Sequence, residues 1–202
     1  ELPDGATEIP WDREPTHAVG VFAREQGAVV PDRLVASAKS WLAHAGVERT
    51  RGILPWGADL GDQMLSPVDV SAAFLNHIKN AWNHRFGEER DAAGTPCLLE
   101  EQQIILTVPA SFDEIGRELT LRAAQDAGLE HIILLEEPLA AFYAWLWRNE
   151  DHWQDLLNEG EGVVVVDVGG GTTDLSFIRI EPGFTLRRTA VGDHLLLGGD
   201  NM

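Results

Sequence analysis

The stretch VVVVDVGGGTTDLSFIRI, residues 163–180, carries the most specific pattern in the sequence. Two apolar runs, 163–168 and 174–181, have the composition of strands, and a glycine-rich loop separates them. A dinucleotide-binding fingerprint has its glycines between a strand and a helix, and a P-loop requires a lysine after its last glycine. Neither pattern fits this stretch, so we predict a β-hairpin with a glycine turn.

The glycine turn favours a phosphate-binding site. Gly169, Gly170 and Gly171 present successive backbone N–H groups with no Cβ atom beside them, and such an arrangement suits phosphate oxygens. The hydroxyl groups of Thr172 and Thr173 add donors. The alternative is a purely structural turn, but most hairpins need only a two-residue turn for that task.

Two carboxylates flank the turn. Asp167 ends the first predicted strand and Asp174 begins the second. Beside a triphosphate, such carboxylates favour Mg²⁺ held through water. The structural alternative is that both aspartates serve as turn residues.

Composition limits the classes of function. The chain has 202 residues and a formal net charge of −18, with 33 acidic residues against 15 Lys and Arg. That balance argues against a nucleic-acid partner, because phosphate backbones are bound by Lys and Arg. A single nucleotide is still compatible, since backbone N–H groups, one lysine and a magnesium ion can hold it.

Compartment and membrane attachment are also constrained. We expect no membrane span, because no apolar run is long enough. The first residues lack the pattern of a signal peptide, and the single cysteine, Cys97, fits a reducing compartment. These features predict a cytoplasmic protein.

Helical periodicity predicts two helices in the first part of the chain. Residues 32–46 have one apolar face, with Asp32 as the N-cap and Gly46 at the end. The segment 66–87 begins with a capping-box-like Ser66-Pro67-Val68-Asp69 start and ends at Gly87.

The middle of the chain predicts a βαβα unit. A strand over 102–109 precedes a helix over 113–128, and a strand over 131–138 precedes a helix from Pro138 to Asn149. This alternation is typical of parallel strands in a layered α/β fold. A further short apolar segment follows the hairpin at 184–190.

Together these motifs resemble the ATPase domain of the 70-kDa heat-shock chaperones, the DnaK-type family with an actin-like (ribonuclease H-like) fold. The segments that carry the resemblance are VPASFDEIGR, LEEPLAAF, DVGGGTTD and LGGDN, in that order along the chain. The resemblance is strong over 66–202 and looser over 1–65. It implies a peripheral subdomain of the first lobe at 1–66, a first-lobe core at 67–158 and the start of the second lobe at 159–202.

The resemblance also implies roles for residues around the nucleotide. The three glycines and Thr172 would form a phosphate loop, with the Thr172 hydroxyl near the γ-phosphate. Asp167 would orient magnesium-bound water, Glu137 would act from the neighbouring strand end, and Asp174 is similar to the family's second loop aspartate. Glu136 is expected to point to the other face and to be structural.

Further residues are assigned by the same resemblance. Lys39 looks like the lysine that reaches the γ-phosphate and the attacking water, although a solvated helix lysine is an equal alternative. Pro109 and Arg117 resemble the pair that transmits nucleotide state to the peptide-binding domain, against the alternative that Arg117 is a surface charge. Gly198 and Gly199 look like a turn that lies along the phosphates.

The resemblance implies ATP, ADP and Mg²⁺ as ligands, and it implies unfolded peptides, a J-domain co-chaperone and a nucleotide exchange factor as partners. The family's first phosphate loop and its adenine-enclosing segment have no counterpart in these residues. We therefore expect this segment alone to bind ATP weakly and to turn over little. A small-molecule kinase of the actin-like superfamily and a nucleotide-regulated filament or scaffold protein are the alternative functions.

Overall fold

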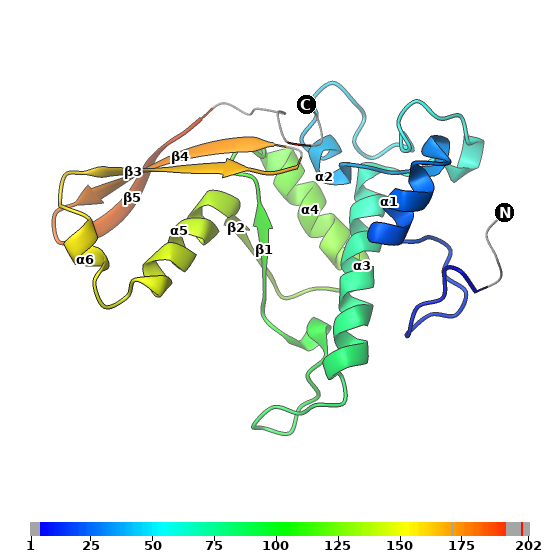
Figure 1. Cartoon of the computed structure of the whole chain (residues 1–202), viewed down its shortest axis with the longest axis horizontal. Helices are drawn as coiled ribbons and strands as arrows, with labels where there is room; N and C mark the ends of the chain where they lie inside the picture. The colour runs from blue at the N-terminus through cyan, green and yellow to red at the C-terminus, as the bar shows by residue number, and fades with distance from the viewer. Residues whose placement is uncertain (1–4, 171, 193–198, 200–202) are drawn as a thin grey trace. The chain divides into compact units, whose positions relative to one another are not determined.

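A computed structural model describes residues 5–170, 172–192 and 199, and Figure 1 shows the course of the chain. The α-helices are α1 (Val21–Gly27), α2 (Ala38–Trp41), α3 (Pro67–Phe86), α4 (Glu114–Asp126), α5 (Glu137–Arg148) and α6 (Trp153–Leu156). The strands are β1 (Ile104–Val108), β2 (Ile132–Glu136), β3 (Gly162–Val168), β4 (Thr173–Glu181) and β5 (Thr185–Val191). Short 3₁₀ turns occupy Pro31–Arg33, Gly61–Gln63 and Leu99–Glu101. The chain is thus mixed α/β, as predicted.

The chain divides into two compact units. Unit 1 comprises Glu1–Ile104 and Glu118–Ile132, and unit 2 comprises Ile105–Arg117 and Ile133–Met202. The predicted glycine hairpin lies in unit 2.

Helix α3 of unit 1 confirms the predicted start. Ser66 Oγ accepts a hydrogen bond from the Asp69 N–H at 3.1 Å, and an Asp69 carboxylate oxygen accepts one from the Ser66 N–H at 3.1 Å. This reciprocal pair satisfies two N–H groups that the first helical turn leaves without partners. Pro67 occupies the first helical position, where its missing N–H costs nothing.

The predicted helix over 32–46 is wrong for most of its length. The chain forms a 3₁₀ turn at Pro31–Arg33, is extended at Leu34, and adopts a left-handed conformation at Ser37 with φ of 54°. Only α2 remains helical. The apolar residues still reach a core, because Ala38 is buried with Leu54 and Val70. Tertiary packing has therefore overridden the local helical pattern.

Two small sheets form in place of one continuous layer. Strands β1 and β2 pair with each other, and β3, β4 and β5 form a three-stranded antiparallel sheet in that order. The register of the second sheet shifts between Phe177 and Ile178, which pair with Ala190 and Arg188 and skip Thr189 of β5. The strands predicted at 163–168 and 174–181 are confirmed to within one residue, and the apolar segment at 184–190 forms most of β5.

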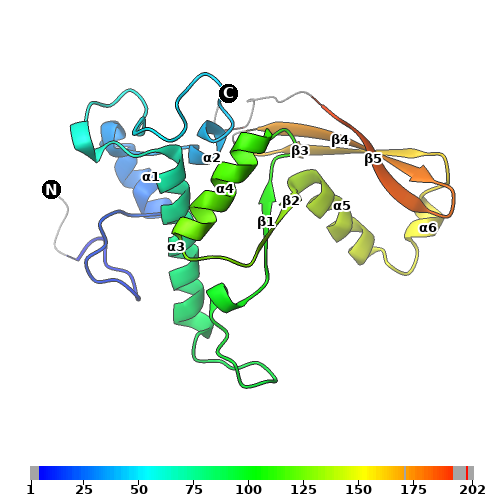
Figure 2. The ribbon, with the colours of Figure 1, turned by 180° about the vertical axis from the view of Figure 1, so that it is seen from behind.

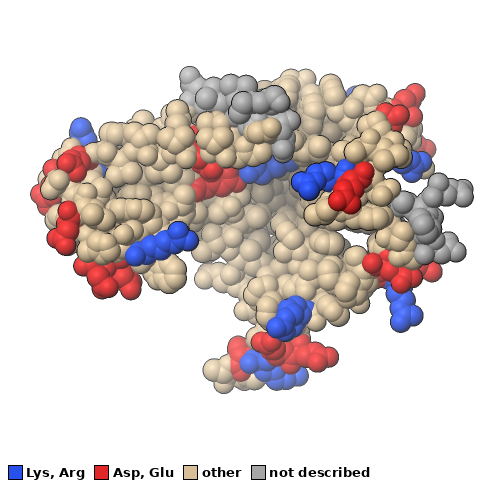
Figure 3. All heavy atoms as spheres, viewed as in Figure 1, with Lys and Arg blue, Asp and Glu red and all other residues tan. Residues whose placement is uncertain are grey.

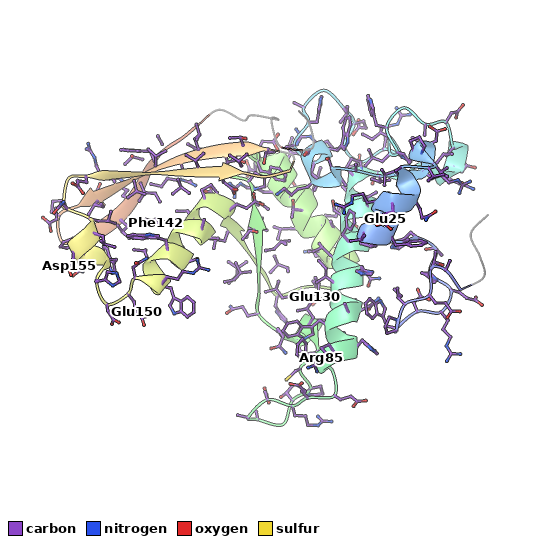
Figure 4. All side chains as sticks on the ribbon, viewed as in Figure 1. Glu25, Arg85, Glu130, Phe142, Glu150 and Asp155 are labelled. Atoms are coloured by element: carbon purple, nitrogen blue, oxygen red, sulfur yellow. The ribbon has the colours of Figure 1, made fainter. Side chains whose placement is uncertain are left out.

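Helix α5 packs against β3 and β4, and Figures 1 and 2 show it on the same side of the three-stranded sheet from both directions. The sheet residues Ser176, Ile178 and Ile180 are fully buried. Figure 4 labels Phe142 on α5, on the side of the helix that faces the sheet. Phe142 and Trp145 line a cavity of about 270 Å³ with Val163 to Val166. This apolar contact fixes the helix that begins at Glu137 against the hairpin strands.

Charge is unevenly distributed over unit 2. Figure 3 shows acidic side chains gathered near α6, where Figure 4 labels Glu150 and Asp155. Within the described ranges, no helix is both long enough and apolar enough for a membrane crossing.

Candidate functional site

The glycine turn joins β3 and β4 as predicted. Asp167 lies opposite Asp174 and Val168 lies opposite Thr173 in the antiparallel register. The Gly169 N–H donates to the Thr172 carbonyl at 2.9 Å and closes the turn. That N–H is therefore engaged within the hairpin, and phosphate donors would have to come from the following residues of the turn.

The local fold does not itself require glycine at position 169. The φ angle of Gly169 lies outside the left-handed region, and a Cβ placed there would lie 3.5 Å from the Thr172 carbonyl oxygen, an ordinary contact. Gly169 and Gly170 are both exposed. The glycine at 169 thus leaves backbone open for another group to approach.

Gly199 contacts the hairpin. The Gly199 N–H donates to the Gly169 carbonyl at 3.0 Å, although the two residues are far apart in the sequence. Gly199 is exposed, and a Cβ at this position would meet no atom within 4 Å. Gly171 and Gly198, which sequence analysis also assigned to phosphate binding, lie outside the described residues.

The two aspartates share one face of the sheet, because directly paired residues of neighbouring strands point the same way. Asp174 is 2% exposed, and its Oδ1 accepts the Ser111 N–H at 3.1 Å. Asp167 is half-buried, and Thr172 is 4% exposed. The predicted pairing of two carboxylates beside the turn is therefore present, and one of them also anchors the loop after β1.

Glu136 and Glu137 stand at the junction between β2 and α5. Glu136 ends β2 and is the N-cap residue of α5, and Glu137 begins the helix ahead of Pro138. A carboxylate in the first helical turn is stabilised by the N–H groups there. Glu137 is half-buried in unit 2, which also contains the hairpin.

Arg117 points inward and is not a plain surface charge. One of its terminal nitrogens lies 2.8 Å from Glu136 Oε1, and its Nε donates to the Phe112 carbonyl at 3.3 Å. Pro109 is fully buried, and its carbonyl accepts the Phe112 N–H at 3.1 Å. Pro109 and Arg117 thus both form hydrogen bonds with the backbone of Phe112, in the loop after β1.

Lys39 lies on α2 in unit 1 and is exposed. It is therefore not among the residues that unit 2 brings together.

The donor set can be compared with what a magnesium ion requires. Across the described part of the chain, no group of three or more His, Cys, Asp and Glu side chains is close enough to hold a metal directly. Two opposed carboxylates beside a glycine turn nevertheless suit Mg²⁺, which keeps most of its waters and takes phosphate oxygens as ligands. The residues present fit a water-mediated site.

One displaced carboxyl pKa lies in unit 1. Partial burial raises the pKa of Glu100, but hydrogen bonds from Asn83 and from its own backbone N–H, together with the charge of Lys79, outweigh burial and leave the pKa lowered. The Asn83 amide nitrogen donates to Glu100 at 2.8 Å, and its oxygen accepts the Leu99 N–H at 2.8 Å. This network ties α3 to the segment before β1.

A second lowered pKa lies in unit 2. The backbone N–H and the side-chain amide of Asn158 both donate to Glu161, and these bonds lower the pKa of its carboxyl group. Asn158 and Glu161 thus close the turn that leads into β3.

Sequence analysis missed two residues of this site. Arg188 on β5 forms an ion pair with Glu136, and Ser111 holds Asp174. A possible signal for Arg188 is its position opposite Ile178 on the covered face of β4, where an arginine requires a partner. No local pattern singles out Ser111, because its contribution is a backbone N–H.

Comparison with known proteins adds a family assignment. The family described as Hsp70 protein matches residues 12–202. The chain is 34% identical to a chaperone protein HscA homolog of Actinobacillus pleuropneumoniae over 201 residues, which cover 93% of this chain and 29% of that protein. It is 34% identical over 184 residues to the homolog of Acidithiobacillus ferrooxidans, covering 85% of this chain and 26% of that protein. A homolog from Acinetobacter baylyi is 36% identical over 137 residues, 68% of this chain and 20% of that protein. The chain therefore spans less than a third of the length of these relatives.

Proposed function

The chain belongs to the Hsp70 protein family, and on that premise we propose that it forms part of the ATP-binding domain of a molecular chaperone. The family implies the actin-like ATPase fold. In the full-length protein, ATP binding and hydrolysis would be coupled to the binding of unfolded peptides.

The observation that carries this proposal is the hydrogen bond between Gly169 and Gly199. It joins two exposed glycines that are far apart in the sequence, and neither position needs glycine for local steric reasons. Backbone without side chains at both of these glycines is suited to the close approach of a phosphate chain. We assign Gly170, Gly171, Thr172, Thr173 and Gly198 to the same phosphate site.

The acidic residues would hold the magnesium ion through water and orient the attacking water. Asp167, Asp174 and Glu137 would contact magnesium-bound water, and Asp167 and Glu137 would orient the water that attacks the γ-phosphate. When bound, Mg²⁺ would supply charge neutralisation on the phosphate oxygens. The bond from Ser111 to Asp174 would keep that carboxylate oriented while leaving its second oxygen for water.

Two further assignments belong to this proposal. Lys39 would approach the γ-phosphate from the peripheral subdomain and offset its charge. Pro109 and Arg117, which hold the loop after β1, would transmit nucleotide state to the peptide-binding domain.

The finer organisation is proposed as well. Residues 1–66 would be the peripheral subdomain of the first lobe, residues 67–158 its core, and residues 159–202 the start of the second lobe. A J-domain co-chaperone and a nucleotide exchange factor would act on the full-length protein, which we place in the cytoplasm. ADP would be the product that the exchange factor releases.

Family membership favours this function over the small-molecule kinase and the filament protein. The test is ATP hydrolysis by the protein at its natural full length, measured with Mg²⁺ and with peptide. Hydrolysis that peptide stimulates would support the chaperone. Transfer of the γ-phosphate to a small molecule, or nucleotide-dependent polymerisation seen by light scattering, would support one of the alternatives.

A further inference from the structure

A partly buried ion triad in unit 2 joins three elements around the candidate site. The Glu136 carboxylate is 12% exposed and lies 2.8 Å from Arg117 on one oxygen, while its other oxygen pairs with Arg188. Arg117 comes from α4, Glu136 from the end of β2 and Arg188 from β5. We propose that Glu136 is a positioning residue for ATP hydrolysis, acting through this triad.

The triad is continuous with the hairpin on one side. Arg117 Nε also donates to the Phe112 carbonyl, in the loop whose Ser111 N–H holds the Asp174 carboxylate. Asp174 in turn lies opposite Asp167 across the hairpin. A shift of Arg117 would therefore reach both carboxylates that flank the glycine turn.

The triad is continuous with α5 on the other side. Glu136 is directly bonded to Glu137, and Glu136 is the N-cap residue from which α5 starts. Holding both oxygens of Glu136 fixes the direction of the chain at that peptide, and with it the Glu137 carboxylate. Arg188 meanwhile ties the same point to β5, since it pairs with Ile178 of β4 in the sheet. The triad thus fixes the position of Glu137 relative to the hairpin.

The charges of the triad explain why this arrangement is rigid. One carboxylate faces two guanidinium groups, so neutralising Glu136 would leave two arginines without their shared anion. Two like charges that share a partly buried place without an anion repel each other, and the arginines would move apart. The movement would displace Glu137 and the loop at Ser111 without removing any group that contacts nucleotide.

The chain offers a matched control pair on β4 and β5. Arg187 is the neighbour of Arg188 on β5, but its side chain is 69% exposed, against 30% for Arg188. It pairs with Glu181 at 3.5 Å on the opposite face of the strand. Arg187→Met and Glu181→Gln therefore remove the same kinds of charge without touching the triad.

The inference rests on the proposed ATPase function and is tested by steady-state hydrolysis with the full-length protein. Glu136→Gln and Arg188→Met should lower kcat about tenfold or more, as loss of a supporting contact does at metal sites, with KM within about twofold of wild type. Arg188→Lys keeps the charge and should recover most of the activity. The two control variants should behave as wild type. Arg188→Met leaves the Arg117–Glu136 pair intact, so it remains informative where Glu136→Gln fails to fold.

Two outcomes would overturn the inference and are distinguishable. A wild-type protein that neither binds nor hydrolyses Mg-ATP would remove the proposed function and this inference with it. A wild-type protein that hydrolyses ATP, together with a folded Arg188→Met variant of unchanged kcat and a lower melting temperature, would leave the function standing. The triad would then have only a structural role.

Discussion

The backbone N–H of Gly199 donates to the carbonyl oxygen of Gly169 at 3.0 Å. This bond joins Gly199 to the glycine hairpin between β3 and β4. It uses the Gly169 carbonyl, while the Gly169 N–H closes the hairpin turn. The N–H groups that remain for a ligand therefore lie beyond Gly169 in the turn. Neither Gly169 nor Gly199 has a side chain that would cover them.

Gly169→Ala should separate ligand binding from folding. A methyl group at this position meets only an ordinary contact with Thr172, so the melting temperature should change by no more than a few degrees. Affinity for Mg-ATP should fall about tenfold, or about 1.4 kcal/mol, because the methyl group obstructs the phosphates. Calorimetry on the full-length protein measures both the affinity and the stability. Unchanged affinity in a folded variant would remove Gly169 from the site.

Asp167→Asn should impair hydrolysis more than binding. The amide keeps the size of the side chain but loses the charge that would hold magnesium-bound water. We expect kcat to fall about a hundredfold, with a much smaller change in the affinity for Mg-ATP. Single-turnover hydrolysis compared with equilibrium binding separates the two effects. Equal rates in wild type and variant would exclude Asp167 from catalysis.

Ser66→Ala should destabilise α3. The change removes the cap that accepts the Asp69 N–H, and it should lower the free energy of unfolding by about 1–2 kcal/mol. Ser71→Ala is the matched control, because Ser71 only donates to the Pro67 carbonyl inside the same helix and alanine favours helix. Urea unfolding followed by tryptophan fluorescence compares the two. Equal loss in both variants would contradict the capping role.

Asn83→Ala should raise the pKa of Glu100. Loss of the Asn83 hydrogen bond leaves burial, which raises that pKa, less opposed. A lowered carboxyl pKa adds stability above the unfolded pKa, near 4.5 here, and that stability is lost as pH falls through the folded pKa. The stability difference between wild type and variant should therefore shrink on acidification.

An NMR titration that follows the side-chain carboxyl carbons measures the pKa of Glu100 directly. Glu161 serves as an internal control, because its pKa is lowered by Asn158 and should not respond to the change at Asn83. A Glu100 pKa that stays in place would assign its lowering to Lys79 and the backbone instead.

Local signals in the sequence were enough for the hairpin and for α3. The β-branched run at 163–166 and the following glycines determine a strand and a turn without help from distant residues. The start of α3 is equally local, since Ser66 and Asp69 satisfy each other within one turn. Such elements are predictable because their partners are neighbours in the chain.

Contacts between distant residues could not be predicted in this way. The helical pattern at 32–46 failed because Ala38 packs against Leu54 and Val70, and this packing is compatible with an extended approach and a left-handed Ser37. The ion triad was missed for a similar reason. Glu136 was expected to be structural, but no local pattern pointed to its arginine partners, which come from α4 and β5.

Mg-ATP binding to the wild-type full-length protein, measured by calorimetry beside Gly170→Val, tests the central claim most directly. We predict that wild type binds with a stoichiometry of one and that the valine, placed on the exposed turn, abolishes binding while the protein stays folded. A wild-type protein that binds no nucleotide, or a folded Gly170→Val variant that binds as tightly as wild type, would contradict the assignment of the glycine hairpin as a phosphate site.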